Sequence, residues 1–215
     1  MKLIGLTGSI GMGKSTAAAM LRRLKLPLYD ADRAVHRVMR PHGPAVAAIA
    51  AAFPGVVRDG AVSRKALGDA VFADPSALRR LEAIVHPLVA AERQRLIRAW
   101  RRRRVPIAVL DMPLMYEINA ASQVDLAIVV SAPARLQRRR VLARPGMTAP
   151  RFEGILARQV PDREKRRRAD FVVPTGLGRA TTLRSLRRII RLLRAGWTRR
   201  RRHAGNRARY RNDRA

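Results

Sequence analysis

The chain has 215 residues, enough to bury a sizeable core, and its lack of cysteine excludes a disulfide framework and a thiolate metal site. Its formal charge is +31, from 46 lysine and arginine residues against 15 acidic ones, which favours anionic partners such as nucleotides, phosphorylated metabolites and nucleic acids. With no signal-like leader and no span of about eighteen apolar residues, the sequence predicts a cytoplasmic protein without membrane insertion.

Residues 2–16 (KLIGLTGSIGMGKST) predict a buried strand over 2–7, a phosphate-binding loop and the start of a helix. The loop matches G-x-x-x-x-G-K-[ST], in which backbone N–H groups surround a polyphosphate. Lys14 is expected at the β- and γ-phosphates of ATP, and the Ser15 hydroxyl at Mg²⁺. A glycine-rich turn without a ligand is the weaker alternative, because strand and helix flank the motif. The predicted nucleotide-binding residues are Gly8, Ser9, Ile10, Gly11, Met12, Gly13, Lys14, Ser15 and Thr16.

A second short strand is predicted over residues 26–29, and it is followed by Asp30 and Asp32. In a parallel sheet the carboxyl ends of the strands share one edge, so both carboxylates are expected near the bound phosphate. A carboxylate there can accept a proton from an attacking hydroxyl or orient Mg²⁺. The alternative is an N-cap for a helix beginning near Arg33, and Asp32 can serve as both.

Residues 33–104 predict a helical insertion with a loop over 53–61 and no parallel strand. A long helix is expected to start near Asp74 and to be kinked or restarted at His86-Pro87. Periodicity alone favours a structural role for this histidine. The four histidines show no ligand-like spacing, so no protein-bound structural metal is predicted.

The third core strand is predicted over residues 105–112, with Asp111 at its end and Pro113 directly after it. An acidic residue at this place in a phosphate-loop fold commonly holds Mg²⁺ through water, and a capped turn is the alternative. A nearly all-apolar fourth strand follows over 124–131, as expected for a strand covered on both faces.

Residues 132–159 carry many arginines and break at 144–146, which predicts a mobile two-helix lid. Arginine suits such a lid because its planar, permanently charged group matches phosphoryl oxygens.

A helix over 164–169, a last strand over 171–173 and an amphipathic final helix complete the core. The basic segment 197–215 is predicted to be a disordered tail, for which plain solvation is favoured over nucleic-acid binding.

These elements predict an α/β phosphate-loop (P-loop) kinase fold, with a five-stranded parallel sheet flanked by helices. The predicted nucleotide-binding core comprises residues 1–32, 105–131 and 160–196. Residues 33–104 form the predicted helical insertion, and residues 132–159 form the predicted lid.

Several stretches, in order along residues 1 to about 195, resemble the dephospho-coenzyme A kinase family. They are IGLTGSIGMGKST, LYDAD, LEAIVHPLV, VLDMPLMYE, QRRRVLARPGMT and LARQVPDREKRRRADFVV. The resemblance implies transfer of the γ-phosphate of ATP to the ribose 3′-hydroxyl of dephospho-coenzyme A, with Mg²⁺, as the last step of coenzyme A synthesis. Another small-molecule or nucleotide kinase, or a nucleic-acid-binding P-loop protein, remains the alternative.

The resemblance also implies that the helical insertion (33–104) binds the coenzyme A substrate, and it implies roles for single residues. Asp32 falls on the family's catalytic base, with Lys14 and Arg140 as further catalytic residues. Arg144 is expected at the nucleotide, and Ile155 stands where many relatives carry arginine. The implied substrate-binding residues are Asp32, His86 and Pro113, and the implied metal-binding residues are Ser15, Asp30 and Asp111.

Overall fold

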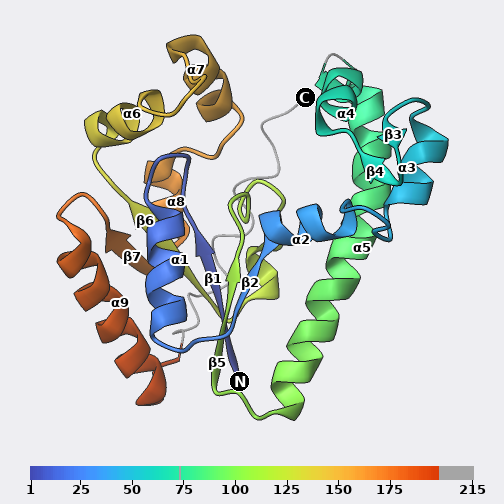
Figure 1. Cartoon of the computed structure of the whole chain (residues 1–215). Coiled ribbons are helices and arrows are strands. Elements are labelled where there is room, and N and C mark those ends of the chain that lie inside the picture. The colour runs from blue at the N-terminus through green and yellow to red at the C-terminus, as the bar shows by residue number, and fades with distance from the viewer. Residues whose placement is uncertain (73, 199–215) are drawn as a thin grey trace, which may run out of the picture.

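A five-stranded parallel sheet forms the centre of the protein, as the sequence predicts (Figure 1). The computed structural model describes residues 1–72 and 74–198. The strand order is β2-β5-β1-β6-β7. The bounds are Lys2–Thr7 for β1, Leu28–Asp30 for β2, Ile107–Asp111 for β5, Leu126–Ser131 for β6 and Phe171–Pro174 for β7.

Both faces of the sheet are buried, which explains why its strands are almost continuously apolar. Successive side chains alternate between the faces, so Ile4 and Leu6 pack on one side and Leu3 on the other. Helices α1 (Lys14–Arg23) and α9 (Arg179–Arg194) cover the first face. The second face is covered by the C-terminal half of α5 (Pro75–Arg102), by α8 (Asp162–Arg168) and by the 3₁₀ helix η1 (Ala120–Gln123).

The segment between β2 and β5 builds a small hydrophobic core of its own around residues such as Ile49, Phe53 and Val85. Its helices are α2 (Ala31–Val38), α3 (Val46–Ala52), α4 (Arg64–Phe72) and the N-terminal half of α5. Part of the predicted loop 53–61 is instead a short antiparallel ribbon of β3 (Val57–Arg58) and β4 (Ala61–Val62). Two-residue strands of this kind are too short to produce a recognisable alternation in the sequence.

The sequence predicts a kink or a restart at His86-Pro87; helix α5 runs without interruption through Pro87, so a restart is wrong. Pro87 has no N–H to donate to the Ala83 carbonyl, and since Ala83 and Pro87 are both exposed, this carbonyl can be solvated. One half of α5 packs on the insertion and the other on the sheet. Tertiary packing at both ends therefore keeps the helix continuous.

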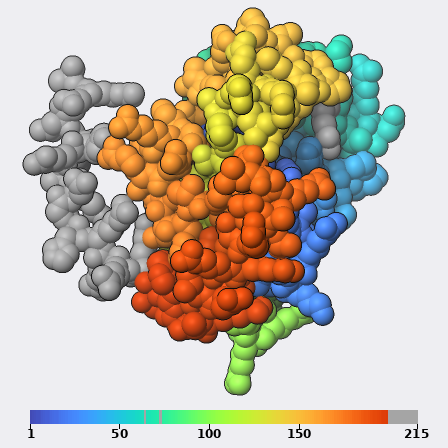
Figure 2. All heavy atoms as spheres, turned by 90° about the vertical axis from the view of Figure 1, so that its left-hand side faces the viewer, coloured from blue at the N-terminus to red at the C-terminus, as the bar shows by residue number. Residues whose placement is uncertain are grey.

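Residues 132–159, the predicted lid, contain two helices, α6 (Ala134–Leu142) and α7 (Ala149–Ala157), and the break in the arginine-rich stretch predicts this pair; the name lid is kept for the segment below. Lid and insertion rise on opposite sides of the carboxyl edge of the sheet (Figure 1). From the side, the lid forms the top of the molecule, with α9 below it (Figure 2).

The predicted disordered tail is wrong at its first residue, Trp197. The Trp197 ring centroid lies 4.7 Å from that of Phe171, and its carbonyl accepts a hydrogen bond from the Lys2 ammonium. The rest of the predicted tail, apart from Thr198, lies outside the described residues. Among the helices of the described part of the chain, none is long and apolar enough to cross a membrane.

Candidate active site

The loop between β1 and α1 has the shape of a phosphate-binding loop. Gly11 and Gly13 have φ angles of +76° and +85°, which side-chain-bearing residues rarely adopt. A Cβ atom on Gly11 would also lie 2.5 Å from a methyl group of Val141 in the lid. Gly13 begins α1 without a side-chain cap, so the first N–H groups of this helix remain available to an anion.

A cavity of about 650 Å³ opens over this loop. All the predicted nucleotide-binding residues from Gly8 to Thr16 line it, together with Asp32, Pro113, Arg140 and Arg144. The structure therefore brings four distant parts of the sequence to one site. The remaining lining residues are Ile155, Gln159, Thr175, Gly178, Arg179 and Thr182.

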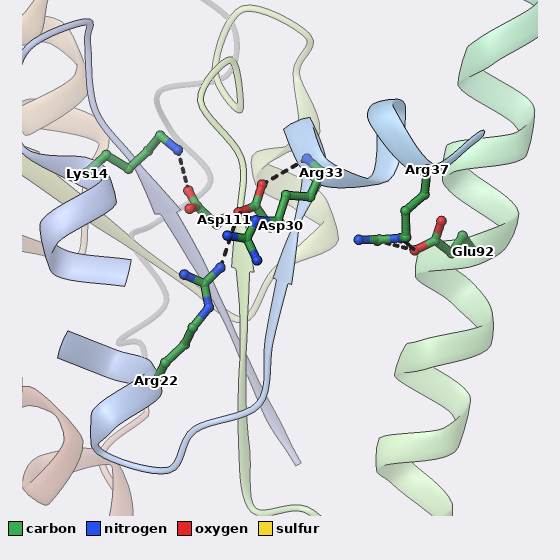
Figure 3. Close-up of polar contacts among 7 residues, drawn as sticks. All are labelled: Lys14, Arg22, Asp30, Arg33, Arg37, Glu92 and Asp111. Carbon is green, nitrogen blue, oxygen red and sulfur yellow. Dashed lines mark hydrogen bonds and ion pairs between the residues drawn. The ribbon is translucent and has the colours of Figure 1, made fainter. Parts of the chain in front are cut away.

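Lys14 and Asp111 form an ion pair beside the loop, with 2.6 Å between Nζ and Oδ1 (Figure 3). Asp111 pairs in register with Leu6 of β1 and Asp30 of β2, which places it in the middle of the carboxyl edge. Its side chain is almost fully buried, and this burial raises the pKa of Asp111, while the neighbouring Lys14 opposes the rise.

The oxygen atoms near the loop suit Mg²⁺, which prefers one or two protein ligands together with phosphate oxygens and water. The Ser15 hydroxyl lines the cavity, and the Asp111 carboxylate lies next to Lys14. Within residues 1–72 and 74–198, no group of three or more His, Cys, Asp or Glu side chains forms a complete metal site. The donor set therefore fits an ion that arrives with a phosphate ligand.

Asp30 and Asp32 point to different sites although one residue separates them. Asp32, in the first turn of α2, lines the cavity and makes no hydrogen bond or ion pair with any described residue. Asp30 is the N-cap of α2, and its carboxylate accepts a hydrogen bond from the Arg33 N–H at 3.1 Å. The expectation that Asp32 caps this helix is therefore wrong.

The Asp30 carboxylate also accepts a hydrogen bond from Arg22 at 3.2 Å and lies 3.6 Å from Arg33 Nε (Figure 3). It lines a second cavity, of about 380 Å³, between β2, α2 and α5. Across this cavity Arg37 of α2 donates a hydrogen bond to Glu92 of α5 at 3.0 Å. Asp30 thus makes contacts typical of a helix cap and an ion pair, and it does not line the cavity over the phosphate loop.

Replacement of Asp30 separates a capping role from metal binding. Asparagine caps helices about as well as aspartate but is a weaker Mg²⁺ ligand, whereas alanine loses about 1 kcal/mol of capping energy. We expect Asp30→Asn to keep the wild-type dependence of activity on Mg²⁺ concentration, and Asp30→Ala to lower the melting temperature. Titration of activity with Mg²⁺ checks this, and a large rise in the Mg²⁺ requirement of the Asn variant would restore Asp30 as a metal ligand.

His86 lies on the exposed surface of α5 and lines neither of these two cavities. The structure thus does not bring it together with the other predicted site residues. In the same region, the Tyr29 hydroxyl donates to the Val89 carbonyl at 3.1 Å and ties β2 to α5. Burial raises the pKa of Tyr29 to about 12.

Arg140 connects the lid to the rest of the site. Its guanidinium donates to the Thr175 carbonyl at 2.8 Å and to the Thr175 hydroxyl at 3.3 Å, and it lies 3.5 Å from the Gly11 carbonyl. The Thr175 hydroxyl in turn donates to the Met12 carbonyl at 2.7 Å. Arg144 lines the cavity from the end of α6, where it is exposed.

Two glutamines of the site were missed by the sequence reasoning. Gln137 Nε2 donates to the Ile10 carbonyl at 2.8 Å, and Gln159 Oε1 accepts from the Ile10 N–H at 3.1 Å. Lid residues were selected by their positive charge, so the arginines were chosen and these neutral glutamines were not. The available signal was their place in the segments QRRRVLARPGMT and LARQVPDREK, which carry the family resemblance. Arg179 and Thr182 of α9 were missed as well and had no comparable signal.

Comparison with known proteins adds a second line of evidence. Residues 2–177 match the sequence model of the dephospho-CoA kinase family. The dephospho-CoA kinase of Paramagnetospirillum magneticum is 61% identical over 166 residues, which cover 77% of this chain and 78% of that one. The dephospho-CoA kinase of Novosphingobium aromaticivorans is 51% identical over 192 residues, or 89% and 94% of the two chains.

Solved structures agree with this fold. The protein TT1252 from Thermus thermophilus superimposes with a TM-score of 0.74 at 35% identity, covering 88% of this chain and 95% of that one. The dephospho-CoA kinase from Campylobacter jejuni shares the fold, with a TM-score of 0.63 at 22% identity over 89% and 97% of the chains. On this evidence, together with the match over residues 2–177, the chain belongs to the dephospho-CoA kinase family.

Proposed function

We propose that the protein transfers the γ-phosphate of ATP to the ribose 3′-hydroxyl of dephospho-coenzyme A, giving coenzyme A and ADP. Family membership supports the reaction and the substrate. The observation that carries the site assignment is the single cavity that joins the phosphate loop, Asp32 and the lid arginines. Its members are the parts that phosphoryl transfer needs: a phosphate cradle, a base and mobile positive charge.

The triphosphate of ATP binds along the backbone of residues 8–16, at the N-terminus of α1. Lys14 moves from Asp111 to the β- and γ-phosphates, which exchanges one anionic partner for another. Arg140 and Arg144 add positive charge from the lid side of the cavity. Ser15 and Asp111 would hold Mg²⁺, which would supply positive charge at the phosphates.

Asp32 acts as the general base. The 3′-oxygen attacks the γ-phosphorus, its proton passes to the Asp32 carboxylate, and the bond between the γ-phosphorus and the β,γ-bridging oxygen breaks to release ADP. The exposure of Asp32 and its lack of a partner in the described chain support this role, because the carboxylate remains free to accept a proton.

For this reaction dephospho-coenzyme A lies between Asp32 and the insertion, with Pro113 at the cavity wall. The Thr7 hydroxyl donates to the Pro113 carbonyl at 3.0 Å and fixes this part of the wall beside β1. Support for His86 as a substrate-binding residue comes from the family resemblance alone, since this residue lies outside the cavity.

The direct test is an assay of purified protein with ATP and Mg²⁺ that offers dephospho-coenzyme A beside adenosine, AMP and an RNA oligonucleotide. We expect selective formation of coenzyme A. Phosphorylation of another acceptor in its place would keep the kinase chemistry but overturn the proposed substrate.

A further inference from the structure

A buried ion pair lies beneath the point where the lid returns to the core. Lys165 of α8 is fully buried, and its Nζ lies 2.8 Å from Oε1 of Glu117, whose side chain is 12% exposed. Glu117 follows β5 in the segment PLMYE, and Lys165 lies in the segment VPDREK. The mechanism above uses neither residue, although both segments carry the family resemblance.

The same carboxylate oxygen also holds the backbone at the end of the lid. The Val160 N–H donates to Glu117 Oε1 at 3.0 Å. Val160 directly follows Gln159, whose side chain accepts the hydrogen bond from Ile10 in the phosphate loop. Glu117 therefore holds the residue directly after Gln159, and Gln159 orients the Ile10 peptide of the phosphate loop.

The beginning of the lid is fastened to the same region. Ser131, the last residue of β6, donates to Asp162 Oδ2 at 2.7 Å, and Asp162 begins α8. Gln137 of α6 holds the other side of the Ile10 peptide. Both ends of the lid are thus tied to the segment 160–165 and to the phosphate loop.

Burying this cluster of charged side chains costs folding free energy, which a purely structural contact between apolar side chains would not. Glu117 Oε2 and Asp162 Oδ1 are buried without a hydrogen-bond partner in the described part of the chain. A buried pair of charges is commonly no more stable than apolar side chains of similar volume, so its presence calls for another explanation.

We propose that Glu117, paired with Lys165, is a positioning residue that sets the C-terminal hinge of the lid and, through Gln159, the phosphate-loop peptide of Ile10. The ion pair with Lys165 holds the Glu117 carboxylate in place, and Glu117 accepts the hydrogen bond of the Val160 N–H. The inference rests on the proposed function only in taking ATP as the ligand of the phosphate loop.

Two double variants separate this role from stability alone. In Glu117→Gln/Lys165→Met both charges are gone, but the amide oxygen still accepts from Val160. In Glu117→Met/Lys165→Met the acceptor is lost as well, and neither variant leaves an unpaired buried charge. ATP affinity is measured by calorimetry without any acceptor substrate, and Glu164→Gln, an exposed change on α8, is the matched control.

We expect Glu117→Met/Lys165→Met to bind ATP about tenfold more weakly than wild type, which is the scale of one well-placed hydrogen bond. Glu117→Gln/Lys165→Met is expected to stay within about twofold of wild type. In a Gln159→Ala background this difference disappears, because the two changes act through one contact. Equal ATP affinities of the two double variants would overturn the proposal. Wild-type protein that binds ATP but does not phosphorylate dephospho-coenzyme A would overturn the proposed function, and the comparison would still decide the role of Glu117.

Discussion

Asp32→Asn is expected to lower kcat for coenzyme A formation by a factor on the order of a hundred or more, while ATP still binds. Asparagine has nearly the same size but cannot accept the proton of the 3′-hydroxyl. Since Asp32 makes no hydrogen bond or ion pair with the described chain, the change removes no structural contact. Steady-state kinetics and a melting curve of the same preparation measure both effects.

Asp69→Asn is the matched control for this prediction. Asp69 is an exposed aspartate on α4 of the insertion and lines neither cavity, so its replacement is expected to leave turnover unchanged. If Asp32→Asn kept near wild-type turnover, Asp32 would not be the general base. A loss of ATP affinity of similar size would instead indicate that this carboxylate acts in nucleotide binding.

Lys14→Met is expected to lower kcat/KM for ATP by about a hundredfold to a thousandfold, the usual loss when a preorganised charged donor is removed from a phosphoryl-transfer site. Lys14→Arg keeps a cation beside Asp111 but has a longer, planar group that does not fit the same phosphate position. We therefore expect Lys14→Arg also to be strongly impaired. Full ATP-dependent turnover in either variant would contradict the phosphate-loop assignment.

The two Lys14 variants are expected to differ in stability, because Asp111 loses its ion pair only in Lys14→Met. Burial already raises the pKa of Asp111, and without the opposing effect of Lys14 this pKa rises further. A raised folded-state pKa means that stability is retained below the ordinary pKa of aspartate and is lost as pH rises through the folded-state value. Lys14→Met should therefore be more destabilised, relative to wild type, at pH 7 than at pH 4.

Urea unfolding at the two pH values measures this difference. The double variant Lys14→Met/Asp111→Asn has no carboxylate at this position, so its destabilisation is expected to be similar at both pH values. The same pH dependence in the double variant would show that the effect does not come from Asp111.

The sequence alone predicted those elements that are determined by residues close together in the chain. The phosphate loop is contiguous from Gly8 to Thr16, and its glycines, lysine and flanking strand and helix can be identified without a structure. The five parallel strands could be predicted because both faces of the sheet are buried, which makes each strand a short apolar run. The two helices α6 and α7 could be predicted for a similar reason, since Arg144-Pro145-Gly146 breaks a helical pattern just after α6 ends.

The structure was needed to separate Asp30 from Asp32, because local sequence did not distinguish them and the family resemblance placed both at the phosphate site. Asp30 is the last residue of β2 and turns its carboxylate to the start of α2 and to Arg22, whereas Asp32 lies within the first helical turn and faces the loop cavity. A change from strand to helix between the two residues sends their side chains in different directions. That transition comes two residues before the one predicted from sequence.

The other features that the sequence did not predict depend on contacts between residues far apart in the chain. Gln137 and Gln159 reach Ile10 across 127 and 149 positions of the chain, and neutral side chains of this kind carry no local mark of such contacts. Helix α5 continues through Pro87 because its two halves pack on different cores. The sequence by itself thus determined the phosphate loop, the parallel sheet and the family. Tertiary structure alone decided that Asp30 turns away from the loop cavity and that Gln137 and Gln159 meet the phosphate loop, because packing energy between distant segments outweighs local preference.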